Sequence, residues 1–388
     1  MKSGFNVIDS ELHLMEPPDL WEKHLPEPFR SRTKFSHPSA LGGAARVEYG
    51  NGVAYDANTS EIRGLMKRHT ERRMASDPRL AFAARNCAPD VWLTDMDVEG
   101  IDVAVLMPTR MLGLLMVDGL DPEHALAMCR VYNDYAHEFT TAAPERFKFW
   151  AWLPKQDARL AAAEARRCMQ ELGAIGVAMT THGVDDHLLL DDFYEPLWAE
   201  LDRLGAPLGL HVSNSAQHDN IRVRYQGHPR TEVLMRSIAG VYYAMTSLEE
   251  LIYGGVLERY PSIKPVIMET SVGWLPWLLW RMDEMWDTFG PDAGHSLTLR
   301  PSDYFRRQCY AVADCDEDLA RYVVDYGLEN NILFSTDYPH HDSPWPEGVN
   351  TFLGLEGLTD AVKRKIMWDN GAALYGLEAP VALAAAVR

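Results

Sequence analysis

Ionisable side chains stand at the ends of four apolar segments of the sequence, and their types match those that bind metal ions. The segments lead into Glu11 and His13, His211, Glu269 and Asp337. In an extended chain, residues i and i+2 point to the same side, so Glu11 and His13 can face one ion. Unpaired buried charges are costly, and a divalent cation is a natural partner for several carboxylates. We therefore expect a metal site where these segments meet.

His340 follows Asp337 by three residues and adds another imidazole to the candidate set. Imidazole nitrogen suits Zn, Fe and Mn better than Mg or Ca. The candidate ligands, which could hold one ion or two ions roughly 3.5–4 Å apart, are Glu11, His13, His211, Glu269, Asp337 and His340. Three weaker candidates, for which a structural or solvated role is the commoner one, are His182, His218 and His228.

Eight short runs rich in Val, Ile and Leu predict buried parallel strands, because most are apolar along nearly their whole length. Helical patterns separate the runs. One begins at the capping residue Asp121, which Pro122 follows, and another ends at Gly173. This repeated order is typical of βαβ crossovers. The predicted strands are residues 5–9, 103–108, 147–153, 174–180, 207–211, 265–269, 308–313 and 331–337.

Eight strands with intervening helices predict an α/β fold, a (β/α)8 barrel of the TIM type. The rival is a doubly wound open sheet, but the sequence has no G-x-G-x-x-G after the first strand and no Walker motif. We expect one domain over residues 1–388, with a long insertion after strand one at about 14–85 and a polar loop at 213–236. Both follow strand ends, where barrel loops form active sites. The insertion is expected to be a lid or an oligomer contact.

The charge balance limits the partners. The chain has 56 acidic and 37 basic residues and a formal net charge of −19, which disfavours binding to nucleic acid or to an anionic membrane. Its five cysteines include no CxxC pair, which favours a reducing compartment and argues against a cysteine-built zinc site. The first ten residues show no signal-peptide pattern. We expect a cytoplasmic homo-oligomer that acts on a small molecule.

Four segments resemble the amidohydrolase-related family 2, which includes aminocarboxymuconate-semialdehyde and γ-resorcylate decarboxylases. They are VIDSELHLMEPPDLW at 7–21, GVLERYP at 255–261, METSVGWLP at 268–276 and FSTDYPHHD at 334–342. The resemblance runs from residue 5 to about residue 375. It implies a (β/α)8 barrel with a metal at its C-terminal mouth, and the residues that match the family's ligands are Glu11, His13, His211 and Asp337.

Two positions depart from the family pattern. Many members carry His-x-His on strand one, whereas this chain has Glu11 and His13, as in the resorcylate decarboxylase type. The family's decarboxylases have a proton-handling histidine at the end of strand six, where this chain has Glu269. Glu269 with His340 is expected either to act in acid–base catalysis or to complete a second metal position.

The leading hypothesis is a metal-dependent enzyme that cleaves a C–N, C–O or C–C bond of a small organic acid, by hydrolysis or by non-oxidative decarboxylation. The ion would activate a water or hold a substrate carboxylate. The alternative is an O2-dependent dinuclear non-heme hydroxylase with an Fe/Fe or Mn/Fe centre, because mixed carboxylate–histidine ligands also occur in di-iron proteins. A third hypothesis, a non-catalytic partner of an active paralogue, is disfavoured by candidate ligands at all four strand ends.

Overall fold

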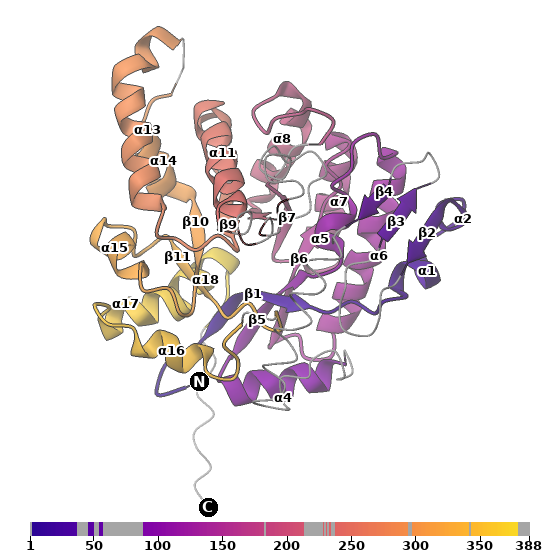
Figure 1. Ribbon diagram of the computed structural model, residues 1–388, viewed down its shortest axis with the longest axis horizontal. Coiled ribbons are helices and arrows are strands. Elements are labelled where there is room, and N and C mark those ends of the chain that lie inside the picture. Colours follow the sequence, from indigo (N-terminus) through magenta and orange to yellow (C-terminus); the bar gives the residue numbers. More distant parts are fainter. Residues whose placement is uncertain are drawn as a thin grey trace, which may run out of the picture.

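The computed structural model describes residues 2–36, 46–49, 54–56, 88–181, 184–212, 237–293, 297–340 and 343–378, together with residues 228, 230 and 233. Eight parallel strands curve into a nearly closed barrel, and helices cover its outside (Figure 1). The strands follow one another around the barrel in chain order, from β1 through β5 to β11. The predicted (β/α)8 barrel is therefore confirmed.

The barrel strands are short and almost entirely buried, which explains their apolar sequences. Two of them, β5 and β8, have the predicted bounds, and the others differ by a few residues. The strands are β1 (Ile8–Leu14), β5 (Val103–Pro108), β6 (Phe147–Trp152), β7 (Gly176–Thr180), β8 (Pro207–His211), β9 (Lys264–Met268), β10 (Tyr310–Asp314) and β11 (Ile332–Ser335).

Strand one differs most from its prediction. It begins later than residue 5 and continues to Leu14, so Glu11 and His13 lie inside the strand rather than beyond it. The prediction missed this because it followed apolar residues, whereas β1 buries polar ones along its whole length. The pairing of β1 with β5 also shifts register between Asp9 and Leu12, as at a β-bulge.

The helices connect successive strands. The side chain of Asp121 accepts a hydrogen bond from the Glu123 N–H at 3.1 Å and caps α6 as predicted. In Figure 1, α13 extends beyond the rest of the molecule at the upper left. Among the described residues, the helices outside the first insertion are α4 (Pro89–Glu99), α5 (Met111–Leu114), α6 (Pro122–Thr140), α7 (Ala158–Gln170), η3 (Asp192–Tyr194), α8 (Glu195–Leu204), α11 (Ala239–Tyr253), α12 (Val256–Arg259), α13 (Leu275–Phe289), η4 (Gly290–Ala293), α14 (Pro301–Gln308), α15 (Ala320–Asp325), α16 (Gly348–Gly354), α17 (Asp360–Arg364), η5 (Lys365–Asp369) and α18 (Asn370–Tyr375).

The described part of the first insertion contains helices α1 (Leu20–His24) and α2 (Phe29–Arg32) and a small antiparallel sheet. The sheet consists of β2 (Thr33–Ser36), β3 (Arg46–Tyr49) and β4 (Ala54–Asp56). The Trp21 indole donates a hydrogen bond to the Met128 carbonyl at 3.1 Å and ties the insertion to α6. The rest of the insertion and most of the 213–236 loop lie outside the described residues, so their predicted role over the active site stays a prediction.

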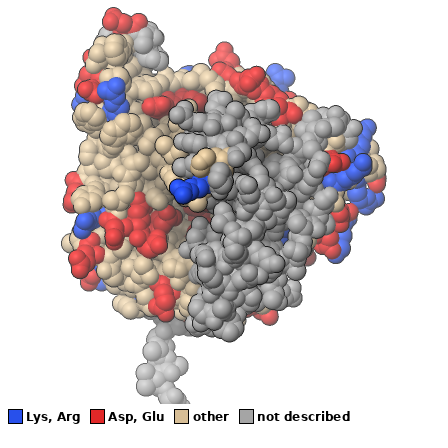
Figure 2. All heavy atoms as spheres, viewed as in Figure 1, with Lys and Arg blue, Asp and Glu red and all other residues tan. Residues whose placement is uncertain are grey.

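Acidic clusters mark the described surface of the face shown in Figure 2, in keeping with the excess of acidic residues in the sequence. The described helices include none that is both long enough and apolar enough to cross a membrane.

The interior of the barrel holds a large aromatic side chain beside the predicted metal site. Trp150 is fully buried, and its indole N–H donates to the Ser10 carbonyl at 3.2 Å, next to Glu11. Gly176 makes room for this ring, since a Cβ at that position would lie 2.3 Å from the indole. The position therefore requires glycine because of close packing.

Candidate metal centre

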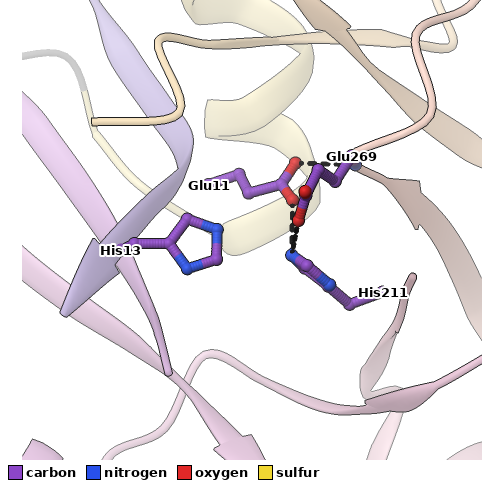
Figure 3. A group of neighbouring side chains, drawn as sticks. All are labelled: Glu11, His13, His211 and Glu269. Carbon is purple, nitrogen blue, oxygen red and sulfur yellow. Dashed lines mark hydrogen bonds and ion pairs between the residues drawn. The ribbon is translucent and has the colours of Figure 1, made fainter. Parts of the chain in front are cut away.

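At the C-terminal end of the barrel, His211 at the end of β8 meets Glu11 of β1 and Glu269, which follows β9. His211 Nε2 lies 3.0 Å from Glu11 Oε1 and 3.0 Å from Glu269 Oε2. The Glu269 N–H also donates to Glu11 Oε2 at 3.2 Å. Figure 3 shows these three side chains in contact, with the His13 ring directed toward them from β1. Residues far apart in sequence thus meet at one point, as predicted from the strand ends.

A second set of contacts surrounds Asp337, which follows β11. Asp337 Oδ1 lies 3.3 Å from His13 Nε2 and 2.8 Å from His340 Nδ1. The His13 and His340 rings lie close together, with centroids 3.8 Å apart. All six predicted ligands therefore occupy one region of the barrel mouth.

The six side chains form two overlapping groups. Within each group the possible ligand atoms lie within 4.8 Å of one another, slightly more than the ~4.4 Å between two opposite ligands of an ion with ~2.2 Å bonds. His13 and Glu269 belong to both groups, and Asp337 lies in the second group with His340. The first group is Glu11, His13, His211 and Glu269; the second is His13, Glu269, Asp337 and His340.

Backbone carbonyls orient two of the imidazoles. His13 Nδ1 lies 3.0 Å from the Pro108 carbonyl oxygen, and His211 Nδ1 lies 2.5 Å from that of Val212. A carbonyl oxygen only accepts hydrogen bonds, so each Nδ1 is the donor. The arrangement directs each Nε2 toward the cluster, and a hydrogen bond of this kind commonly orients a metal-binding histidine.

Two carboxylate residues of the cluster have unusual backbone conformations. Glu269 has φ 52° and Asp337 has φ 53°, in the left-handed region that non-glycine residues rarely adopt. Each costs about 1–3 kcal/mol and persists only where surrounding contacts maintain it. Glu317 provides such contacts after β9, because its carboxylate accepts hydrogen bonds from the Val272 and Gly273 N–H groups at 2.7–3.0 Å.

The deepest part of the cluster contains polar atoms that contact one another or Glu269 and Asp337 at 3.0–3.3 Å without forming a hydrogen bond. Glu11, His13 and His211 are at most 2% exposed. Glu11 Oε1, His13 Nε2 and His211 Nε2 have no hydrogen-bond partner of acceptable geometry in the described part of the chain. Leaving a buried polar atom unsatisfied costs about 1–3 kcal/mol. One cation bound by all three atoms would remove this cost, and the imidazole and carboxylate donors suit a transition metal.

Burial and neighbouring charges perturb the protonation of these groups. Burial raises the pKa of Glu11 to about 7, although its contact with His211 opposes the shift. Burial and the nearby His340 and His211 imidazoles hold the pKa of His13 well below its ordinary value. Burial acts in the same direction on His211, but the Glu269 and Glu11 carboxylates outweigh it and raise the pKa of His211 well above its ordinary value. His13 is therefore neutral, the form that binds metals.

Comparison with known proteins decides the family. The amidohydrolase family model matches residues 8–377. The chain belongs to the amidohydrolase family. This amidohydrolase is 28% identical over 305 residues to a gamma-resorcylate decarboxylase of Rhodococcus jostii (strain RHA1), which covers 74% of this chain and 88% of the relative. It is 24% identical over 296 residues to a 2-amino-3-carboxymuconate-6-semialdehyde decarboxylase of Dictyostelium discoideum, covering 76% and 78% of the two chains.

A solved structure supports the same fold. The dihydroxybenzoic acid decarboxylase from Polaromonas sp. JS666, solved with manganese and the inhibitor 2-nitroresorcinol, superposes on this amidohydrolase with a TM-score of 0.64. The two sequences are 21% identical, and the match covers 96% of this chain and 97% of the other. At this identity the likeness shows a shared barrel.

The weaker histidine candidates do not join the cluster. The His228 side chain is exposed, and its Nδ1 accepts a hydrogen bond from the Arg230 N–H at 3.1 Å. His182 and His218 lie outside the described residues. Conversely, Asp9 was not predicted, although burial raises its pKa to about 6 and it contacts the Glu11 backbone. A charged residue in an otherwise apolar segment was the signal that could have revealed it.

Proposed function

We propose that this amidohydrolase is a metal-dependent decarboxylase that removes the carboxyl group of a small aromatic acid without oxidation. The observation that carries the proposal is the buried histidine–carboxylate cluster, whose unsatisfied atoms match a bound divalent ion. The curated relatives described above are decarboxylases, which favours decarboxylation over hydrolysis.

We assign the deep ligands of the ion to Glu11, His13 and His211, which are the most buried members of the cluster. Glu269, Asp337 and His340 complete the site on its more accessible side. The donor set is compatible with Zn, Fe or Mn, and manganese in a related structure favours Mn. When bound, a divalent ion supplies positive charge that holds the substrate carboxylate and a neighbouring phenol oxygen.

Decarboxylation replaces a carboxyl group with hydrogen, so the site must deliver one proton to the ring carbon. The C–C bond breaks, its electrons remain on the ring carbon, the proton bonds there and CO2 leaves. Glu269 and His340 are the proposed proton-handling residues, with side chains 29% and 20% exposed. Asp337 orients the His340 imidazole through their 2.8 Å contact, which is the geometry of a positioned general acid.

The test is turnover by the purified, manganese-loaded protein. We expect gamma-resorcylate or a related hydroxybenzoate to release CO2 and, in D2O, to gain one deuterium on the ring carbon that lost the carboxyl group. The inhibitor 2-nitroresorcinol should compete with the substrate. Metal-free protein is the control. Turnover of esters or amides, with none of the hydroxybenzoates, would replace this proposal with hydrolysis.

The two overlapping ligand groups favour one second candidate, the dinuclear O2-dependent hydroxylase. Glu269 has two carboxylate oxygens and can bridge two ions, whereas His13 offers only Nε2 because its Nδ1 contacts the Pro108 carbonyl. The groups therefore contain enough donors for two ions. Two irons, or iron and manganese, per chain and substrate-dependent O2 uptake would support this candidate. One ion per chain and decarboxylation under nitrogen would exclude it.

A further inference from the structure

Asp9 connects the two backbone segments that carry Glu11 and Asp337. It is fully buried in β1. Its Oδ1 accepts the Glu11 N–H at 3.1 Å. Its Oδ2 accepts both the N–H of Thr336 at 3.1 Å and the Thr336 hydroxyl at 2.5 Å. A single carboxylate thus holds a ligand residue of β1 and the residue next to a ligand after β11.

Ser335 makes a second connection between the same segments. Its hydroxyl donates to the Glu11 carbonyl at 3.1 Å and accepts the Asp337 N–H at 2.9 Å. Side chains therefore hold both the N–H and the carbonyl of Glu11. Both Ser335 and Thr336 are 1% exposed, so these hydrogen bonds are shielded from competing water.

These side chains lie where regular backbone pairing is missing. In the described strands, ladders run around the barrel from β1 to β11, and none joins β11 back to β1. The register shift in β1 also falls between Asp9 and Leu12. Beyond the end of β11, the Tyr338 carbonyl accepts a hydrogen bond from the N–H of His13 in β1 at 2.7 Å. Asp9 and Ser335 thus substitute for a ladder at the junction that carries Glu11, His13 and Asp337.

We propose that Asp9 is a positioning residue of the metal centre, which sets the spacing between Glu11 and Asp337. The proposal rests on the metal site of the proposed function and is independent of the reaction. Asp9 has no ion pair with a lysine or arginine in the described chain, and an uncompensated buried carboxylate opposes folding. One hydrogen bond from the backbone of the ligand Glu11 and two from Thr336, which precedes Asp337, provide a functional reason for a carboxylate at this position.

The Asp9→Asn variant tests the proposal because asparagine has nearly the same size as aspartate and keeps one acceptor oxygen. Its amide NH2 replaces the other oxygen and cannot accept a hydrogen bond from the Glu11 or Thr336 N–H. Ser335→Ala removes the parallel connection without enlarging the side chain. The matched control is Glu164→Gln on the outer helix α7, since Glu164 is also fully buried but pairs with Arg130 and Arg167. Mn²⁺ binding is measured by titration well below each variant's unfolding temperature.

Removing a residue that orients a metal ligand typically weakens metal affinity about 10–100-fold. We expect an increase of this size in the Mn²⁺ Kd of Asp9→Asn and a smaller one in Ser335→Ala. Glu164→Gln should lower Tm and leave the Kd unchanged. Wild-type Kd in folded Asp9→Asn would overturn the proposal, even if Tm fell. If Asp9→Asn does not fold, the Mn²⁺ Kd of Ser335→Ala and of Thr336→Val is measured instead. A wild-type Kd in both of these variants would then overturn the proposal. Failure of the wild-type chain to bind Mn²⁺ or Zn²⁺ would instead overturn the metal centre itself.

Discussion

The imidazole of His13 and the carboxylate of Asp337 face each other between β1 and the end of β11, with Nε2 3.3 Å from Oδ1. His13 is fully buried, while the side chain of Asp337 is 20% exposed. Asp337 thus lies between the buried ligands and the accessible side of the centre, where it also contacts His340.

The first prediction concerns this contact. Asp337→Asn keeps the size of the side chain, and asparagine tolerates the left-handed backbone at φ 53° better than alanine does. We expect a folded protein that has lost bound metal or at least ~99% of its activity, since a 100-fold loss corresponds to ~2.7 kcal/mol. Circular dichroism measures folding, metal analysis measures bound metal, and CO2 release measures activity. Full activity and metal content would make Asp337 a structural residue.

A second prediction uses Glu269→Gln to separate proton handling from a bridging role. The amide is nearly isosteric but is a poorer ligand and carries no titratable proton. On the decarboxylase proposal, the wild type and the variant each bind one ion, and the variant loses most of its kcat. On the hydroxylase alternative, the metal content falls from two ions toward one. Metal analysis of both proteins after loading with excess iron, manganese or zinc distinguishes the outcomes.

Stability should depend on pH through Glu317, whose pKa burial raises from 4.5 to about 7. A pKa raised in the folded state means that the protonated form favours folding. This contribution is complete below about pH 4.5 and is lost as pH rises to about 7, with a maximum of ~3 kcal/mol. Glu317→Gln should therefore show a smaller decrease of Tm across this window than the wild type. Parallel Tm profiles would contradict the expectation.

Metal removal should destabilise the chain. An ion that binds only the folded state adds about 2.7 kcal/mol of stability when its concentration is 100 times its Kd. We expect a chelator to lower Tm and added Mn²⁺ or Zn²⁺ to restore it, because Glu11, His13 and His211 then regain a partner. Thermal unfolding at several metal concentrations measures the effect. A Tm that changes with neither chelator nor added metal would argue against a metal site formed by these three residues.

Several features of the fold are local and can be derived from the sequence. The runs at 103–108 and 207–211 are apolar because both faces of each strand are buried, and they match β5 and β8. Asp121 marks the start of α6 because a capping side chain acts within a few residues. The six candidate ligands could be identified because ionisable residues are unusual beside buried strands. Strand one was misplaced because β1 buries Asp9, Glu11 and His13 and lacks a continuous apolar pattern.

The sequence by itself determined the barrel class, the family resemblance and the identity of the residues that meet at the barrel mouth. Only the tertiary structure decided that these residues form two overlapping groups that share His13 and Glu269. It also placed the Asp9 carboxylate against Thr336 and the Ser335 hydroxyl against Glu11. The physical reason is the distance along the chain over which each interaction acts. Burial and capping act on neighbouring residues and leave a periodic trace, whereas the distance between Asp9 and Thr336 depends on how the whole barrel closes.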